Sequence, residues 1–169
     1  MTLYSRTARS LPVRVGASST LAAGALLLTG CVAAVPLQPA TDATNSSCAD
    51  LIVHLPVMVG DQPERETNAQ GTGAWGDPAT VLLHCGVAVP GPTTLPCRSI
   101  NGIDWIEDDS DAPRYRFTTY GRDPATEVVI DSEKVSGSTV LVDLAGAVSN
   151  IPATGKCLGA EDVTIPTDG

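Results

Sequence analysis

A run of four residues, Trp75-Gly76-Asp77-Pro78, is the first place in this sequence where side chains could recognise a ligand. An indole ring can stack on a flat ring of a ligand, and the Asp77 carboxylate can accept hydrogen bonds from its hydroxyl or amino groups. Alternatively, Asp before Pro with Gly beside it forms a tight turn, and Trp75 fills the core. The composition of the run favours the structural interpretation, and Trp75 and Asp77 remain candidate ligand-binding residues.

A second group of residues could form a small polar pocket if two hairpins lie side by side. Asp104 and Trp105 would then share a surface with Thr119, Tyr120 and Arg122. Asp, Tyr, Arg and Trp together could hold a peptide or a sugar. In the alternative interpretation Trp105 is buried, and Arg122 makes a surface ion pair that contributes little to stability. This second interpretation is favoured.

Recognisable catalytic and cofactor motifs are absent from the sequence. There is no Gly-x-Ser-x-Gly elbow, phosphate loop or dinucleotide fingerprint. His54 and His84 are isolated, and the acidic run 107–111 lacks the spacing of a calcium loop, so we expect neither a metal nor a cofactor. Asp77 and Asp104 could act as an acid–base pair only with their carboxyl groups in one cleft, about 5–10 Å apart. A binding role is therefore favoured over a catalytic one.

The N-terminus has the features of an export signal. Residues 1–14 contain three arginines and no acidic residue, and residues 15–30 are uncharged. The following Leu28-Thr29-Gly30-Cys31 resembles the bacterial lipobox, which implies cleavage before Cys31 and a lipid on its sulfur. The alternative is an uncleaved anchor, because residues 15–35 are close to the roughly 20 residues that a membrane span needs. The rest of the chain is exported in both cases.

The charge of the chain excludes one class of partner. The 169 residues have a formal net charge of −9. Removing residues 1–30, which hold three of the ten basic residues and none of the acidic ones, leaves 139 residues with a side-chain charge of −12. Nucleic-acid binding needs a basic face, so we do not expect it. We expect a protein attached to the outer face of the cell membrane by lipid on Cys31, with an envelope protein or a wall component as its partner.

Four cysteines remain after Cys31, and an even number in an exported chain predicts two disulfides. Three connectivities are possible. We favour Cys85–Cys97, which closes a short proline-containing loop, together with Cys48–Cys157, which joins the two ends of the domain.

The chain divides into four parts: a signal peptide (1–30), a lipid-anchored linker rich in small residues (31–46), a domain (47–160) and a tail (161–169). The domain begins with a capping-box-like Ser47-Cys48-Ala49-Asp50 and a short helix that Pro56 kinks or stops. Residues 61–80 are interpreted as loop. A last helix begins near Ser138 and stops at 150–152.

Strands are predicted between the two helices. The runs 81–87, 115–120 and 126–130 have strand composition, and Asn101-Gly102 predicts a two-residue hairpin with Ile100 opposite Ile103 and Arg98 opposite Trp105. The fold class is therefore α+β: an antiparallel sheet of about five strands, with an N-terminal and a C-terminal helix packed on one face.

Several of these motifs, in this order, resemble the actinobacterial DUF3515 family. They are Ala74-Trp75-Gly76-Asp77-Pro78, Cys85-Gly86-Val87, Asn101-Gly102-Ile103-Asp104-Trp105, Thr119-Tyr120-Gly121-Arg122 with Pro124-Ala125, and a final cysteine after a helix. The resemblance implies an exported lipoprotein or membrane-anchored protein of the cell envelope. It implies no activity and no catalytic residues.

Three functions follow as expectations: a binding protein of the envelope, a structural subunit of a membrane complex, and a small wall hydrolase or transferase that uses carboxylates such as Asp77 and Asp104. The structural subunit would need an exposed apolar patch.

Overall fold

The computed structural model describes residues 33–158. The expected signal peptide, the lipidation site Cys31 and the tail 161–169 lie outside the described residues.

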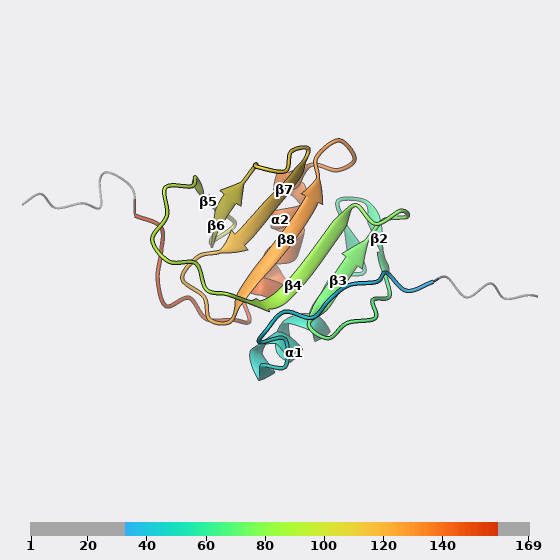
Figure 1. Cartoon of the computed structure of the whole chain (residues 1–169), viewed down its shortest axis with the longest axis horizontal. Coiled ribbons are helices and arrows are strands. Elements are labelled where there is room, and N and C mark those ends of the chain that lie inside the picture. Colours follow the sequence, from blue (N-terminus) through green and yellow to red (C-terminus); the bar gives the residue numbers. More distant parts are fainter. Residues whose placement is uncertain (1–32, 159–169) are drawn as a thin grey trace, which may run out of the picture. The chain divides into compact units, whose positions relative to one another are not determined.

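The described residues form one antiparallel sheet with the strand order β1-β2-β3-β4-β8-β7-β6-β5 (Figure 1). Each half of the chain contributes four consecutive strands, and the two halves meet where β4 pairs with β8. The strands are β1 (Met58–Val59), β2 (Gln62–Arg65), β3 (Thr72–Trp75), β4 (Val81–Val87), β5 (Cys97–Ile100), β6 (Ile103–Asp108), β7 (Arg114–Thr119) and β8 (Ala125–Asp131).

The α+β class is confirmed, but the sheet has eight strands where about five were expected. The additional strands, β1 to β3, lie between residues 58 and 75, most of which was interpreted as loop. They are two to four residues long, and β2 contains a proline and β3 a glycine, so they lack an apolar–polar alternation long enough to detect. Gly73 is a clear example. A Cβ atom there would lie 2.8 Å from the ring of Trp75 and 2.9 Å from Leu55, so the strand needs glycine for this close approach.

Two helices lie against the sheet. α1 (Ser46–Val53) begins one residue after Asn45, whose side chain accepts a hydrogen bond from the Ser47 N–H. It ends before Pro56, as the position of that proline predicted. α2 (Gly137–Val148) lies behind the middle of the sheet in Figure 1. Both helices are shorter than the roughly 20 residues that a membrane span requires, so neither helix of the described residues can cross a bilayer.

The core lies between the helices and one face of the sheet, here called the inner face. Apolar side chains from the sheet and from α2 fill it, among them Val81, Leu83, Trp105, Phe117, Val128, Ile130, Leu141 and Leu144. Strand side chains alternate, so the intervening residues point to the opposite side. We call this side the open face; it carries Leu82 and His84 (β4), Glu127, Val129 and Asp131 (β8), Arg114, Arg116 and Thr118 (β7), and Ile106 and Asp108 (β6).

Two disulfides are present, as expected, but the favoured pairing was wrong. The bonds are Cys48–Cys85, between α1 and β4, and Cys97–Cys157, between β5 and the C-terminal segment. Cys85 and Cys97 are close in sequence but lie on β4 and β5, with three strands between them. Four strand spacings amount to roughly 19 Å, and cysteines whose Cα atoms are more than about 7 Å apart cannot be bridged.

Residues 33–45, expected to be a linker, lie along the domain (blue in Figure 1). Val35 forms a parallel bridge with Thr67, and the Asp42 N–H donates to the Gly86 carbonyl at 3.0 Å. Gly86 has a φ of 90°, and a Cβ atom there would lie 2.3 Å from the Asp42 carbonyl carbon. Glycine at 86 therefore allows this segment to lie directly on β4.

Candidate functional site

The two tryptophans are both fully buried. Trp75 lies in the core, and its indole N–H donates to the Pro56 carbonyl at 2.9 Å. Trp105 points to the inner face, opposite Arg98 across the predicted hairpin. Neither ring can stack on a ligand at the surface, so the structural interpretation of both residues agrees with their positions.

Asp77 lies in the turn between β3 and β4 and is the most exposed of the candidates. Its carboxylate forms an ion pair with Arg65 at 2.8 Å, and the Asp77 side chain is 77% exposed. The same guanidinium also donates to the Gly76 carbonyl and to the Ala33 carbonyl. Arg65 thus joins this turn to the start of the described chain.

Asp104 and Arg122 both form hydrogen bonds to the C-terminal segment, residues 149–158, which follows α2. The Asp104 carboxylate accepts a hydrogen bond from the Cys157 N–H at 2.7 Å, and the buried Arg122 guanidinium donates to the Ile151 carbonyl. Burial lowers the pKa of Arg122, and the Asp104 charge partly opposes that effect. These contacts assign both residues a role in fixing the chain after α2.

The two carboxylates considered for acid–base catalysis lie far apart. Asp77 follows β3, whereas Asp104 is on β6, four strand spacings away in the sheet. This separation is roughly 19 Å, beyond the distance over which two carboxyl groups act on one bond. The two carboxylates also lie at opposite ends of the sheet. Asp77 follows Trp75, which pairs with Val81 at the start of β4. The Asp104 backbone carbonyl accepts a hydrogen bond from the Tyr120 N–H, just after the end of β7, and the start of β7 is the end that is level with Val81.

Tyr120 does line a depression in the surface, of about 370 Å³. The Cys97–Cys157 disulfide and Ile106 contribute to its walls, and Pro92, Thr93, Leu95 and Leu158 complete them. Of the second predicted group, Asp104 and Arg122 form hydrogen bonds to the segment after α2, Trp105 lies in the core, and Tyr120 lines this depression. The group does not form one polar pocket.

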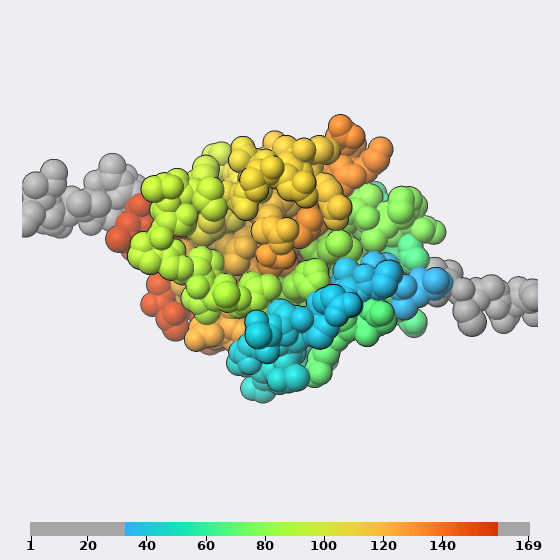
Figure 2. Space-filling model, in the orientation of Figure 1, coloured from blue at the N-terminus to red at the C-terminus, as the bar shows by residue number. Residues whose placement is uncertain are grey.

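The centre of the open face carries a row of charged groups. Figure 2 looks onto this face, which is visible between residues 33–45 (blue) and the yellow-green loop that precedes β5. Arg116 and Glu127 form an ion pair at 2.5 Å across β7 and β8. The hydrogen bond from Arg116 to Glu127 is the main cause that raises the pKa of Arg116.

His84 lies next to this pair, directly opposite Glu127 in the β4–β8 register. Its Nδ1 atom is buried and has no hydrogen-bond partner among the described residues. Partial burial lowers the pKa of His84; the negative charge of Glu127 opposes this shift and the positive charge of Arg116 adds to it. The net effect lowers the pKa of His84, which favours its neutral form beside the paired Arg116 and Glu127.

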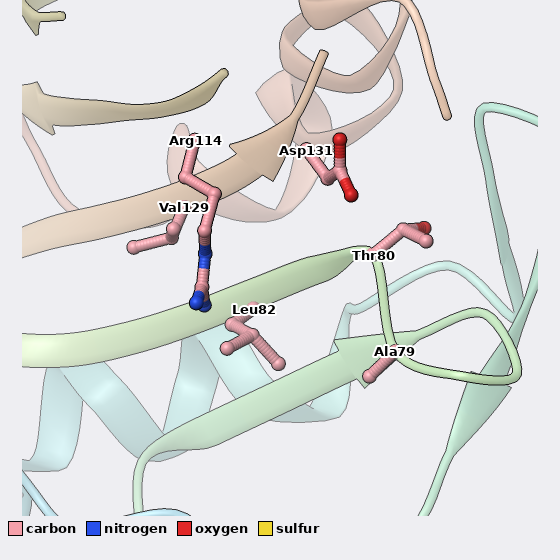
Figure 3. Close-up of a pocket in the computed structure, with 6 residues that line it drawn as sticks. All are labelled: Ala79, Thr80, Leu82, Arg114, Val129 and Asp131. Atoms are coloured by element: carbon pink, nitrogen blue, oxygen red, sulfur yellow. The ribbon is translucent and has the colours of Figure 1, made fainter. Parts of the chain in front are cut away.

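A polar depression of about 200 Å³ lies further along the same face (Figure 3). Arg114 extends across β8, and its guanidinium ends beside Leu82 on β4. Asp131 and Thr80 lie on the other side of the space, and Ala79 lies below them. The depression therefore has a cation at one end, a carboxylate at the other, and Leu82 and Val129 between them.

Among the described residues no group of three histidine, cysteine or acidic side chains is placed to hold a metal ion.

Comparison with known families identifies the chain. A family model described as "Protein of unknown function (DUF3515)" matches residues 18–155. The chain belongs to the DUF3515 family. No curated protein and no solved structure matches it. The DUF3515 match covers every helix and strand of the described residues, so the open face of the sheet and the depression beside Arg114 lie within the matched region.

Sequence reasoning missed the residues that line the Arg114 depression in this DUF3515 domain. The alternation of residues 115–120 and 81–87 does indicate which side chains share a face of each strand. It does not indicate that β8 lies between β4 and β7, which is what brings Arg114, Asp131 and Leu82 together.

Proposed function

We propose that this protein is a lipid-anchored protein on the outer face of the bacterial cell membrane, and that its domain binds an envelope protein or wall component without catalysing a reaction. The open face supports this proposal most directly. Both helices lie on the inner face, while the open face has exposed charged groups and two depressions.

The export part of the proposal is supported by the two disulfides. Disulfides persist in oxidising compartments outside the cytoplasm. The lipid-anchor part of the proposal is supported by the uncharged segment 15–30 followed directly by Cys31. In a Cys31→Ser variant we expect the acyl mass to be lost and the protein to leave the membrane fraction. Unchanged mass and fractionation would contradict lipidation.

The binding part can be tested by photo-crosslinking in living cells. A photoreactive residue at Val129 would report on the open face, and one at Val142, which is 47% exposed on α2, is the matched control. We expect reproducible crosslinks to an envelope protein or to wall material from position 129 but not from position 142. Equal yields from both positions would contradict binding through the open face.

A second candidate function, a structural subunit of a membrane complex, is favoured by one observation. Val53, Val57 and Met58 lie close together in sequence at the end of α1 and the start of β1, and are 75%, 71% and 48% exposed. Exposed apolar groups of this kind often mark a protein contact. A photoreactive residue at Val57 tests this candidate: a dominant crosslink to one membrane protein would favour it over the open-face proposal.

A further inference from the structure

The open face contains two arginines that are matched in position but differ in their partners. Arg114 and Arg116 are two residues apart on β7 and point to the same face. Arg116 reaches diagonally across to β8 and pairs with Glu127. The residue directly opposite Arg114 on β8 is Asp131, with which it makes no ion pair, and the residue in the equivalent diagonal position is Val129, which has no charge. Arg114 makes no ion pair within residues 33–158, and its guanidinium extends over apolar side chains.

The surroundings of the Arg114 guanidinium define what it could bind. A guanidinium presents paired N–H donors that match a carboxylate in a two-point hydrogen bond. The lining is mostly polar, and Leu82, Val129 and Ala79 contribute a small apolar part beside the guanidinium, large enough for a methyl group. At the opposite end the Asp131 carboxylate accepts one hydrogen bond, from the Glu133 N–H, and has further lone pairs for an N–H donor.

We propose that this depression binds the C-terminal residue of a peptide. The carboxylate would pair with Arg114, the small apolar side chain would lie on Leu82 and Val129, and the amide N–H would donate to Asp131. Capture of a chain end by its carboxylate is an established mode of peptide recognition. The volume, about 200 Å³, is below the roughly 300–1,000 Å³ of sites for whole drug-sized ligands and suits one small residue.

The same charges argue against phosphate as the ligand. Asp131 lines the depression and lies within an acidic domain, so a second negative charge on the ligand would be repelled. A C-terminal carboxylate carries a single negative charge, fewer than a phosphate. The amide N–H of the same ligand residue can then donate a hydrogen bond to Asp131. The proposal rests on the proposed function, because it names the chemistry of a ligand for the open face.

The test uses the whole processed protein, purified in detergent, and titrations followed by ligand-observed NMR. The probes are N-acetyl-Ala-Ala with a free carboxylate, the same dipeptide with a C-terminal amide, and inorganic phosphate. Arg114→Gln removes the proposed partner of the carboxylate. Arg98→Gln is the control: it removes the same charge from an exposed arginine on the inner face, where Arg98 pairs with Glu107 at 2.7 Å.

We expect the free dipeptide to bind, and both the amide-capped dipeptide and the Arg114→Gln variant to reduce affinity by at least about tenfold, because a charged hydrogen-bond pair is lost. Arg98→Gln should bind within about twofold of the native protein. Equal binding to Arg114→Gln, absence of dipeptide binding at millimolar concentration, or phosphate binding as tight as the dipeptide would each overturn the proposal. Crosslinking from position 129 distinguishes failure of this proposal from failure of the proposed function. Crosslinks without dipeptide binding would leave binding through the open face supported and would overturn only the carboxylate ligand.

Discussion

Trp75 illustrates how a conspicuous surface motif can serve the interior. Its ring fills the space that Gly73 leaves open, and its N–H is satisfied by the Pro56 carbonyl, so both the apolar body and the polar atom have partners. The neighbouring Asp77 remains exposed because its position in the turn directs it away from the core. Adjacent residues in one motif thus have different roles.

Replacing Trp75 should therefore destabilise the fold without acting on the open face. We expect Trp75→Ala to lower the free energy of unfolding by about 3–5 kcal/mol, because a large buried side chain is removed. Trp75→Phe should cost less, since most of the packing remains while the Pro56 carbonyl loses its donor. Chemical denaturation followed by circular dichroism measures both. Val142→Ala, on the exposed side of α2, is the control and should change stability by no more than about 0.5 kcal/mol.

His84 should make stability depend on pH in a defined direction. Burial lowers its pKa in the folded state, so the unfolded chain binds a proton first as pH falls below about 6.5. The contribution of His84 to stability is complete above that pH and is lost between there and its lower folded pKa. We expect His84→Gln to flatten this part of the pH–stability profile. His54→Gln is the matched control, and a profile unchanged by His84→Gln would contradict the assignment.

At the scale of elements, the disulfides join parts of the fold that the sheet alone does not join. Cys48–Cys85 spans 37 residues and Cys97–Cys157 spans 60, which corresponds to about 4 kcal/mol for each by loop-closure entropy. Cys48 and Cys85 are fully buried, so the Cys48→Ala/Cys85→Ala pair also leaves a cavity. We expect this double variant to be the less stable of the two in chemical denaturation. The Cys97→Ala/Cys157→Ala variant should mainly expose the C-terminal segment to protease.

The elements also show what could be predicted from the sequence. The Asn101-Gly102 hairpin was predicted in loop length and register, because a two-residue loop needs positive φ at both positions and Asn and Gly tolerate it. Long apolar strands such as β4 and β8 were predicted from composition. The order in which those strands pair depends on contacts between residues some 45 positions apart, on which local patterns carry no information. The Arg114 depression and the disulfide pairing were missed for that reason.

At the scale of the whole molecule, residues 33–45 extend the domain beyond the boundary that composition suggested. Gly86→Ala should displace this segment, because the added Cβ would collide with the Asp42 backbone and the φ of 90° disfavours alanine. We expect a loss of roughly 1–3 kcal/mol in stability and faster hydrogen exchange or proteolysis within 33–45. Gly91→Ala is the control, since no atom lies within 4 Å of its added Cβ. Equal behaviour of the two variants would contradict this role of Gly86.

The pairing of β4 with β8 also has a consequence for the order in which the protein can fold. The chain emerges N-terminus first, so β4 is complete long before its partner, and its apolar residues form an unpaired edge until residue 131 has appeared. Non-local pairing of this kind slows folding, and exposed strand edges invite association with other chains. One edge of β4 therefore stays unpaired until β8, the last strand in the sequence, has been synthesised. A chaperone that shields strand edges would act during this interval.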